Sequence, residues 1–213
     1  MAQSKFCSLL LIKAGPNEWD RSGRLSGTAD LPLVQGTAAR YEQLGTHYGG
    51  TLAAMISGPE QGCIEIARAF APRRKPRVED QLHEVGLGLW QGMAEEDVEQ
   101  RFSSCFRDWK INPGSVSIPE AESFVDAQKR LATAMAKPAT KYAADAKHVA
   151  FVLRPLACAL MRCWLEGREM TDFWEVYDSS SGPEGDVTPI LVESTRLKDL
   201  PAASGMPTRA RKS

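Results

Sequence analysis

Short apolar runs that alternate with helical patterns are the feature that most constrains the fold of this chain. Such runs, rich in apolar and in places β-branched or aromatic residues, predict strands over Phe6–Ile12, Thr51–Ser57, His148–Leu153 and Asp186–Ser194. Apolar residues at helical spacing predict helices over Glu60–Phe70, Glu95–Trp109, Glu120–Tyr142 and Pro155–Leu165. Alternating strands and helices favour an α/β fold, a three-layer sandwich with a mostly parallel central sheet. Pro189 places the last strand at an edge or in an irregular position, because proline cannot donate to a central ladder.

The length and charge of the chain bound its organisation. With 213 residues it fits one fairly large α/β domain, which we assign to residues 1–197. Residues 198–213 are rich in Pro, Ala, Ser and basic residues without an apolar period, which is typical of a disordered basic tail. The net charge of −1 predicts no binding to nucleic acid or to an anionic membrane. No apolar run is long enough to span a bilayer, and the N-terminal apolar run is interpreted as a strand, not a signal peptide.

Cysteine and histidine usage predicts neither a metal site nor a cofactor. The cysteines are odd in number and form no C-x-x-C pair or Cys/His zinc spacing. The histidines are scattered along the chain. Common nucleotide-binding and nucleophile-elbow motifs are absent as well. We therefore expect most of the cysteines to be small buried side chains in a reducing cytoplasm. The cysteines are Cys7, Cys63, Cys105, Cys158 and Cys163, and the histidines are His47, His83 and His148.

The order of several short motifs points to a known family. "EWDRSGRLSGTADLPL" follows the first strand, "ISGPEQGCIEIARAFA" follows the second, and "LHEVGLGLWQGM" and "VAFVLRPLACALM" come later. In this order the chain resembles the histidine phosphatase superfamily, the phosphoglycerate-mutase-like proteins, over roughly Phe6–Leu165. The resemblance implies the same three-layer fold, and we place a cap over the carboxyl edge of the sheet at about residues 73–112.

The resemblance also implies that the catalytic residues have changed. The family ends its first strand in Arg-His-Gly, with the histidine as the phosphate-accepting nucleophile, where this chain has Lys13, Ala14 and Gly15. A phosphate-binding asparagine of the family corresponds to Asp20, which follows Trp19.

Two further phosphate-binding positions also differ. An arginine of the family corresponds to Gly62, and its second histidine to Arg154. Only the family's proton donor is kept, as Glu84.

These changes remove the chemistry that the family uses. Alanine cannot attack phosphorus, and losing a nucleophile costs several orders of magnitude in rate. A carboxylate at Asp20 about 4 Å from a phosphate oxygen would cost on the order of 4 kcal/mol at an effective dielectric constant near 20. Lys13 and Arg154 are instead expected to neutralise Asp20 and Glu84 inside the former phosphate pocket.

Several roles stay open at this stage. Glu84 is either a general acid or an ion-pair partner without a catalytic task. Lys13 and Arg154 either bind an anionic ligand or form internal salt bridges, and Arg24 either contacts a ligand or braces its loop. His83 is expected to face away from the pocket, because its neighbour Glu84 faces into it.

We therefore expect a catalytically inactive pseudophosphatase that binds a small anion or a protein partner. The alternatives are an active phosphomonoesterase of the same family with an atypical site, and a structural protein whose pocket is closed. The sequence leaves the oligomeric state and the ligand undetermined.

Overall fold

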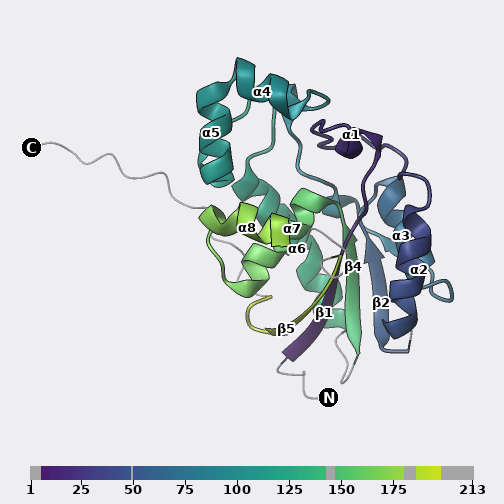
Figure 1. The fold of residues 1–213 in the computed structure, drawn as a ribbon. Helices are drawn as coiled ribbons and strands as arrows, with labels where there is room; N and C mark the ends of the chain where they lie inside the picture. Colours follow the sequence, from purple (N-terminus) through teal and green to yellow (C-terminus); the bar gives the residue numbers. More distant parts are fainter. Residues whose placement is uncertain (1–5, 49, 143–146, 180–185, 198–213) are drawn as a thin grey trace, which may run out of the picture.

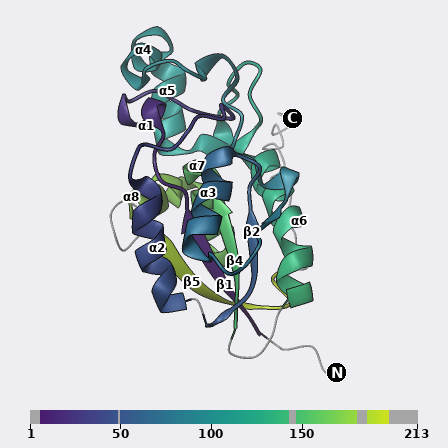
Figure 2. The same cartoon turned by 90° about the vertical axis from the view of Figure 1, so that its right-hand side faces the viewer.

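The computed structural model of the chain describes residues 6–48, 50–142, 147–179 and 186–197. The predicted disordered tail, 198–213, lies outside these residues. A central five-stranded sheet has the order β3-β2-β4-β1-β5 and carries helices on both faces (Figures 1 and 2). The structure is thus the predicted α/β sandwich. Within the described residues, no helix is long and apolar enough to cross a membrane.

The sheet is parallel except at one edge. Strand β4 (His148–Leu153) pairs in parallel with β1 (Phe6–Lys13) on one side and β2 (Leu52–Ser57) on the other. The short β3 (Arg77–Val78) continues the sheet in parallel beyond β2. Strand β5 (Val187–Glu193) closes the other edge antiparallel to β1. Pro189 therefore lies in an edge strand, as expected, where its missing N–H interrupts no central ladder.

Alternate residues of β1 face two separate apolar cores. Leu10 and Ile12 pack with α2 (Thr37–Tyr48) and α3 (Gln61–Phe70). Leu9 and Leu11 belong to the opposite core. Because successive side chains of a strand point to opposite faces, the continuous apolar run Leu9–Ile12 must be covered on both faces.

The second core is covered by the longer helices. These are α6 (Phe124–Tyr142) and α7 (Pro155–Glu166), with α8 (Phe173–Ser179) packed on α7 (Figure 1). The two helical layers hold the sheet between them, so the carboxyl ends of β1, β2 and β4 remain the edge at which loops can build a site.

A helical cap stands beyond the carboxyl edge of the sheet. Its parts are α4 (Glu95–Arg101) and α5 (Ser103–Ile111), which lie at the top of Figure 1. The single helix predicted over Glu95–Trp109 is wrong, since Phe102 leaves helical geometry with φ −129° and ψ 39°. The break lets the ring of Phe102 pack 6.0 Å from that of Trp90, a contact that helical periodicity alone does not anticipate.

Helix boundaries differ from the predictions where side chains cap them. The helix predicted from Glu120 begins at Phe124 instead. Glu120 has a positive φ of 61°, and the Ser123 hydroxyl accepts the Asp126 N–H at 3.0 Å, which caps the first turn.

Some elements were not predicted. Besides α2, β3 and α8, they include the short helix α1 (Glu18–Arg21) and four single turns of 3₁₀ helix, Asp80–Leu82, Gly88–Trp90, Pro113–Ser115 and Met170–Asp172.

Candidate functional site

The loops that follow β1, β2 and β4 bring the predicted site residues to one edge of the sheet. Ala14 directly follows β1, and its N–H donates to the carbonyl of Leu153, the last residue of β4, at 2.7 Å. Arg154 follows at once and is the N-cap of α7. The two positions predicted to correspond to the family's histidines, Ala14 and Arg154, are therefore adjacent in space.

Arg154 forms a buried ion pair with Asp20. Its Nη2 lies 2.9 Å from Asp20 Oδ2 and 3.2 Å from Oδ1, and its Nη1 donates to the carbonyl of Gly15 at 3.3 Å. The side chains are 5% and 25% exposed, respectively. Burial acts to lower the pKa of Arg154, but the carboxylates of Asp20 and Glu84 outweigh it and raise the pKa. The guanidinium is therefore charged, and its charge is balanced from within the protein.

The Asp20 carboxylate receives further hydrogen bonds. The Ser26 hydroxyl donates to Oδ1 at 2.7 Å, and the N–H of Asn17 donates to Oδ2 at 2.8 Å. Asn17 in turn caps α1 by accepting the Asp20 N–H at 2.9 Å. A bound phosphate oxygen would need donors of these kinds, a guanidinium, a hydroxyl and an amide. Here the carboxylate of Asp20 accepts from them instead.

Glu84 caps the N-terminus of α7. Its Oε1 accepts the N–H groups of Val85 at 2.9 Å and Ala157 at 2.7 Å, and its Oε2 accepts that of Leu156 at 2.9 Å. Burial raises the pKa of Glu84 to about 7, against the opposing effects of Arg154 and the backbone amides. Glu84 thus holds the N–H groups of Leu156 and Ala157, which the geometry of α7 leaves without intrahelical partners.

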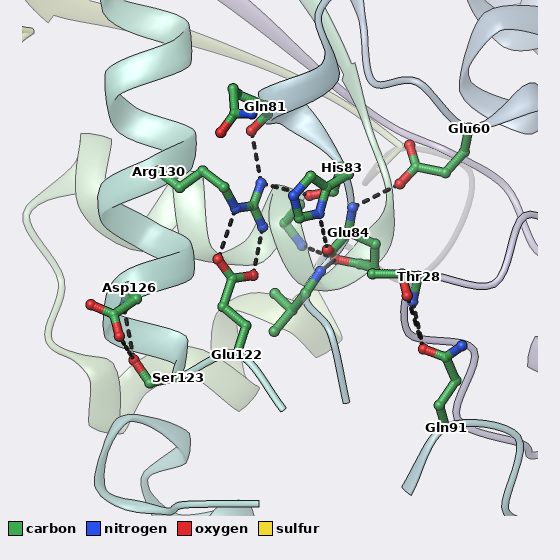
Figure 3. Close-up of polar contacts among 12 residues, drawn as sticks. Thr28, Glu60, Gln81, His83, Glu84, Gln91, Glu122, Ser123, Asp126 and Arg130 are labelled. Atoms are coloured by element: carbon green, nitrogen blue, oxygen red, sulfur yellow. Dashed lines mark hydrogen bonds and ion pairs between the residues drawn. The ribbon is translucent and has the colours of Figure 1, made fainter. Parts of the chain in front are cut away.

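The segment that carries Glu84 is fixed from the side by α6 (Figure 3). Arg130 of that helix makes a two-pronged ion pair with Glu122, at 2.8 and 2.7 Å. Its Nη1 donates to the carbonyls of Gln81 at 2.7 Å and His83 at 3.0 Å. Planar, bidentate contacts of this kind fix orientation, so Glu84 has little freedom to move.

Glu60 holds the same segment from the opposite side. Its Oε1 accepts the Glu84 N–H at 2.7 Å (Figure 3). The imidazole of His83 approaches the Glu84 carbonyl, with Nδ1 at 2.8 Å, and His83 does not line the cleft beneath the cap.

Lys13 is directed to a carboxylate that the sequence analysis did not identify. Its Nζ lies 3.8 Å from Oδ1 of Asp186, and Arg40 approaches Oδ2 of the same carboxylate at 2.5 Å. The Tyr41 hydroxyl donates to the Lys13 carbonyl at 2.6 Å. The expected neutralisation of Lys13 by Asp20 and Glu84 is therefore replaced by pairing with Asp186, which lies just before β5 and has no sequence motif to mark it.

Gly62 and Arg24 take structural positions. A Cβ atom at Gly62 would lie 2.9 Å from Cδ2 of Leu33, so an apolar side chain fills the space beside the position of the family's arginine. Arg24 donates to the carbonyl of Gly92 at 2.8 Å and pairs through its backbone with Ala94, which braces the cap, while it also lines the cleft.

The Asp20–Arg154 pair stands between two hollows. A cleft of about 350 Å³ beneath the cap is lined by Glu84 and Arg154. A second hollow of about 420 Å³ is lined by Ala14 and the Lys13–Asp186 pair. Asp20, Pro155 and Tyr177 line both. Glu84 and Ala14 thus line different hollows, which share Asp20, Pro155 and Tyr177.

Aromatic side chains form the outer wall of the cleft. Trp109 and Trp174 meet edge to face with centroids 4.5 Å apart, and Trp174 Nε1 donates to the Trp109 carbonyl at 2.8 Å. Lys110 lies over the Trp174 ring, 4.4 Å from its centroid, and pairs with Glu95. Lys110, Glu95 and Tyr177 were not predicted as cleft residues, because their helical spacing gives no separate signal.

Metal ligation finds no support in the described part of the chain. No group of three or more His, Cys, Asp or Glu side chains there is arranged to hold a metal ion. The cysteines are all free thiols.

The chain is similar to known proteins in both sequence and fold. The histidine phosphatase superfamily (branch 1) matches residues 9–180. Phosphoserine phosphatase 1 of Hydrogenobacter thermophilus is 24% identical over 169 residues, which cover 78% of this chain and 79% of that protein. Among solved structures, YhfR of Bacillus stearothermophilus superposes with a TM-score of 0.71 at 22% identity, over 78% of this chain and 83% of that one. A mycobacterial glucosyl-3-phosphoglycerate phosphatase in complex with VO3 gives 0.69 at 18% identity, over 78% and 85% of the two chains.

Proposed function

The chain belongs to the histidine phosphatase superfamily, and we propose that it is a non-catalytic member with a binding or regulatory role. The observation that carries the proposal is the Asp20–Arg154 ion pair, which supplies an internal oxyanion where the family binds phosphate. A phosphate dianion would have to displace a carboxylate that already has three kinds of donor.

The other residues of the site support the same proposal. Ala14 carries no nucleophilic atom, and Glu84 accepts three backbone N–H groups in place of delivering a proton. The cap that Glu84 forms on α7 explains its retention through helix stability, without catalysis.

The open cleft favours a binding protein over a scaffold with a closed pocket. Its volume of about 350 Å³ falls within the range of small-molecule sites, and it offers aromatic faces as well as charged groups. Its cations are already engaged: Arg154 with Asp20, Lys110 with Glu95, and Arg24 with a carbonyl. A ligand that stacks on Trp174 therefore fits this cleft better than a phosphomonoester.

The alternative is an active phosphomonoesterase with an atypical site. The names of the relatives, a phosphoserine phosphatase and a glucosyl-3-phosphoglycerate phosphatase, give this alternative its support. It requires a nucleophile other than a histidine at position 14.

Trapping of a phosphoenzyme separates the two. The protein is incubated with a radiolabelled phosphomonoester, quenched, and examined for label on the chain; we expect none. Label that stays on the protein, and that accumulates differently in Glu84→Gln, would overturn the non-catalytic proposal.

A thermal-shift screen tests the binding role. Stacking ligands such as nucleosides should raise the melting temperature, since a ligand at a hundredfold excess over its Kd stabilises by about 2.7 kcal/mol. Trp174→Ala should abolish the shift. No shift with any ligand would favour the structural alternative.

A further inference from the structure

A groove beside α6 carries cations that form no ion pair within the described residues. It has a volume of about 350 Å³ and lies between α6 and the segment that begins with β3. Arg77 lines it from β3, and Lys137 and Lys141 line it from α6. Among the described residues, no ion pair involves any of these three side chains. The groove shares no lining residue with the cleft beneath the cap.

The two walls of the groove are held together at one end. Arg130 lies seven residues before Lys137, so both occupy the same face of α6. Arg130 is used structurally: it binds Glu122 and the carbonyls of the segment that continues from β3 (Figure 3). The groove opens in the following turns of the helix, where the side chains of Arg77, Lys137 and Lys141 are exposed.

Among the described residues, cations outnumber carboxylates along this open part of the groove. Glu79 is the one carboxylate that lines it, against three cations, and the exposed Asp80 comes next along the chain. The C-terminal end of α6 contributes only about half an elementary negative charge. Arg73 and Lys75, exposed in the loop before β3, add further positive charge.

The end of the groove shows that β3 and α6 approach each other closely. A hydrogen bond from Arg77, together with the charge of Lys141, lowers the pKa of the Tyr142 hydroxyl. Lys141 also lies over the Tyr142 ring, 5.2 Å from its centroid. The guanidinium of Arg77, from β3, and the ammonium of Lys141, from α6, thus both lie close to the Tyr142 side chain.

We propose that this groove is a second binding site, for a small organic anion that carries phosphate groups and at least two negative charges. The Arg77 fork suits phosphate oxygens, the two lysines supply point charges, and the volume suits a small molecule. The site does not depend on the former active site, so it stands or fails separately from the proposed non-catalytic role.

Titration calorimetry with inorganic pyrophosphate tests the site. We expect one pyrophosphate per chain, bound more tightly than orthophosphate and more weakly as salt is added. The double variant Lys137→Gln/Lys141→Gln should raise the Kd at least tenfold, because each removes a charge close to the ligand. Lys129→Gln is the matched control, since Lys129 is exposed on the same helix and does not line the groove; its Kd should stay unchanged.

Three results would overturn the proposal. They are the absence of pyrophosphate binding, an equal loss in the Lys129→Gln control, and binding of a glutamate-rich peptide where pyrophosphate does not bind. The last would assign the groove to a protein partner. Circular dichroism of each variant verifies that the surface substitutions leave the fold intact.

Discussion

Replacing Asp20 with alanine should both destabilise the protein and create a phosphate site. The substitution leaves the guanidinium of Arg154, whose side chain is 5% exposed, without its carboxylate. It also removes the acceptor of the Ser26 hydroxyl and of the Asn17 N–H. Breaking a buried pair by removing one partner costs about 3–5 kcal/mol, and the partial exposure of Asp20 places this case at about 3 kcal/mol.

The loss is measurable by urea unfolding and by thermal melting. For a chain of this length, about 3 kcal/mol corresponds to a fall in Tm of roughly 6–12 °C. Asp97→Ala, at an exposed carboxylate in the first turn of α4, is the control and should cost less than about 1 kcal/mol.

Melting in the presence of phosphate then tests whether the Asp20 carboxylate occupies an anion-binding site or only stabilises the fold. Added phosphate should restore part of the Tm of Asp20→Ala, because it replaces the missing oxyanion beside Arg154, and should leave the wild type unchanged. The reasoning is refuted if the variant keeps its stability, or if phosphate stabilises both proteins equally.

Three further predictions concern the supports of the site and the fold. Burial raises the pKa of Glu84 from 4.5 to about 7, so the folded protein holds a proton that the unfolded chain has lost between these values. The contribution of Glu84 to stability should therefore be greatest below pH 4.5 and fall by about 3 kcal/mol as the pH rises to 7. Glu84→Gln should remove this contribution from the pH dependence measured in urea titrations; a pH dependence equal to that of the wild type would contradict it. Gly45→Ala should cost about 3 kcal/mol, because its Cβ would lie 2.0 Å from the backbone carbonyl oxygen of Phe70, whereas Gly50→Ala meets nothing within 4 Å and should be near neutral by the same unfolding assay. Arg130→Lys should cost about 2 kcal/mol and speed amide exchange around Glu84, since an ammonium cannot keep the bidentate ion pair and both carbonyls; equal exchange rates would argue against the positioning role.

The sheet was predictable because its strands carry their own signal. The apolar run of β1 requires cover on both faces, and Pro189 confines β5 to an edge. The two-residue β3 was not predictable, because it has no period of its own and exists through pairing with β2. The break at Phe102 was missed for a similar reason, since packing against Trp90 overrides helical spacing.

Site residues were predictable from the sequence where they fall within a motif that resembles one of the family. Arg154 and Asp20 lie far apart in sequence, yet the resemblance predicts one pocket for both, and the structure pairs them. Asp186 was missed because its role depends on where the chain enters β5, outside any motif. The capping role of Glu84 depends on the direction in which α7 begins, which sequence spacing does not specify.

The most direct test of the central claim is the turnover of p-nitrophenyl phosphate by the purified protein. It is measured beside Glu84→Gln and beside a variant that carries Ala14→His, Asp20→Asn and Arg154→His. We predict that the wild type and Glu84→Gln are both indistinguishable from buffer. Saturable wild-type turnover that Glu84→Gln abolishes would contradict the non-catalytic account, whatever the restored variant does.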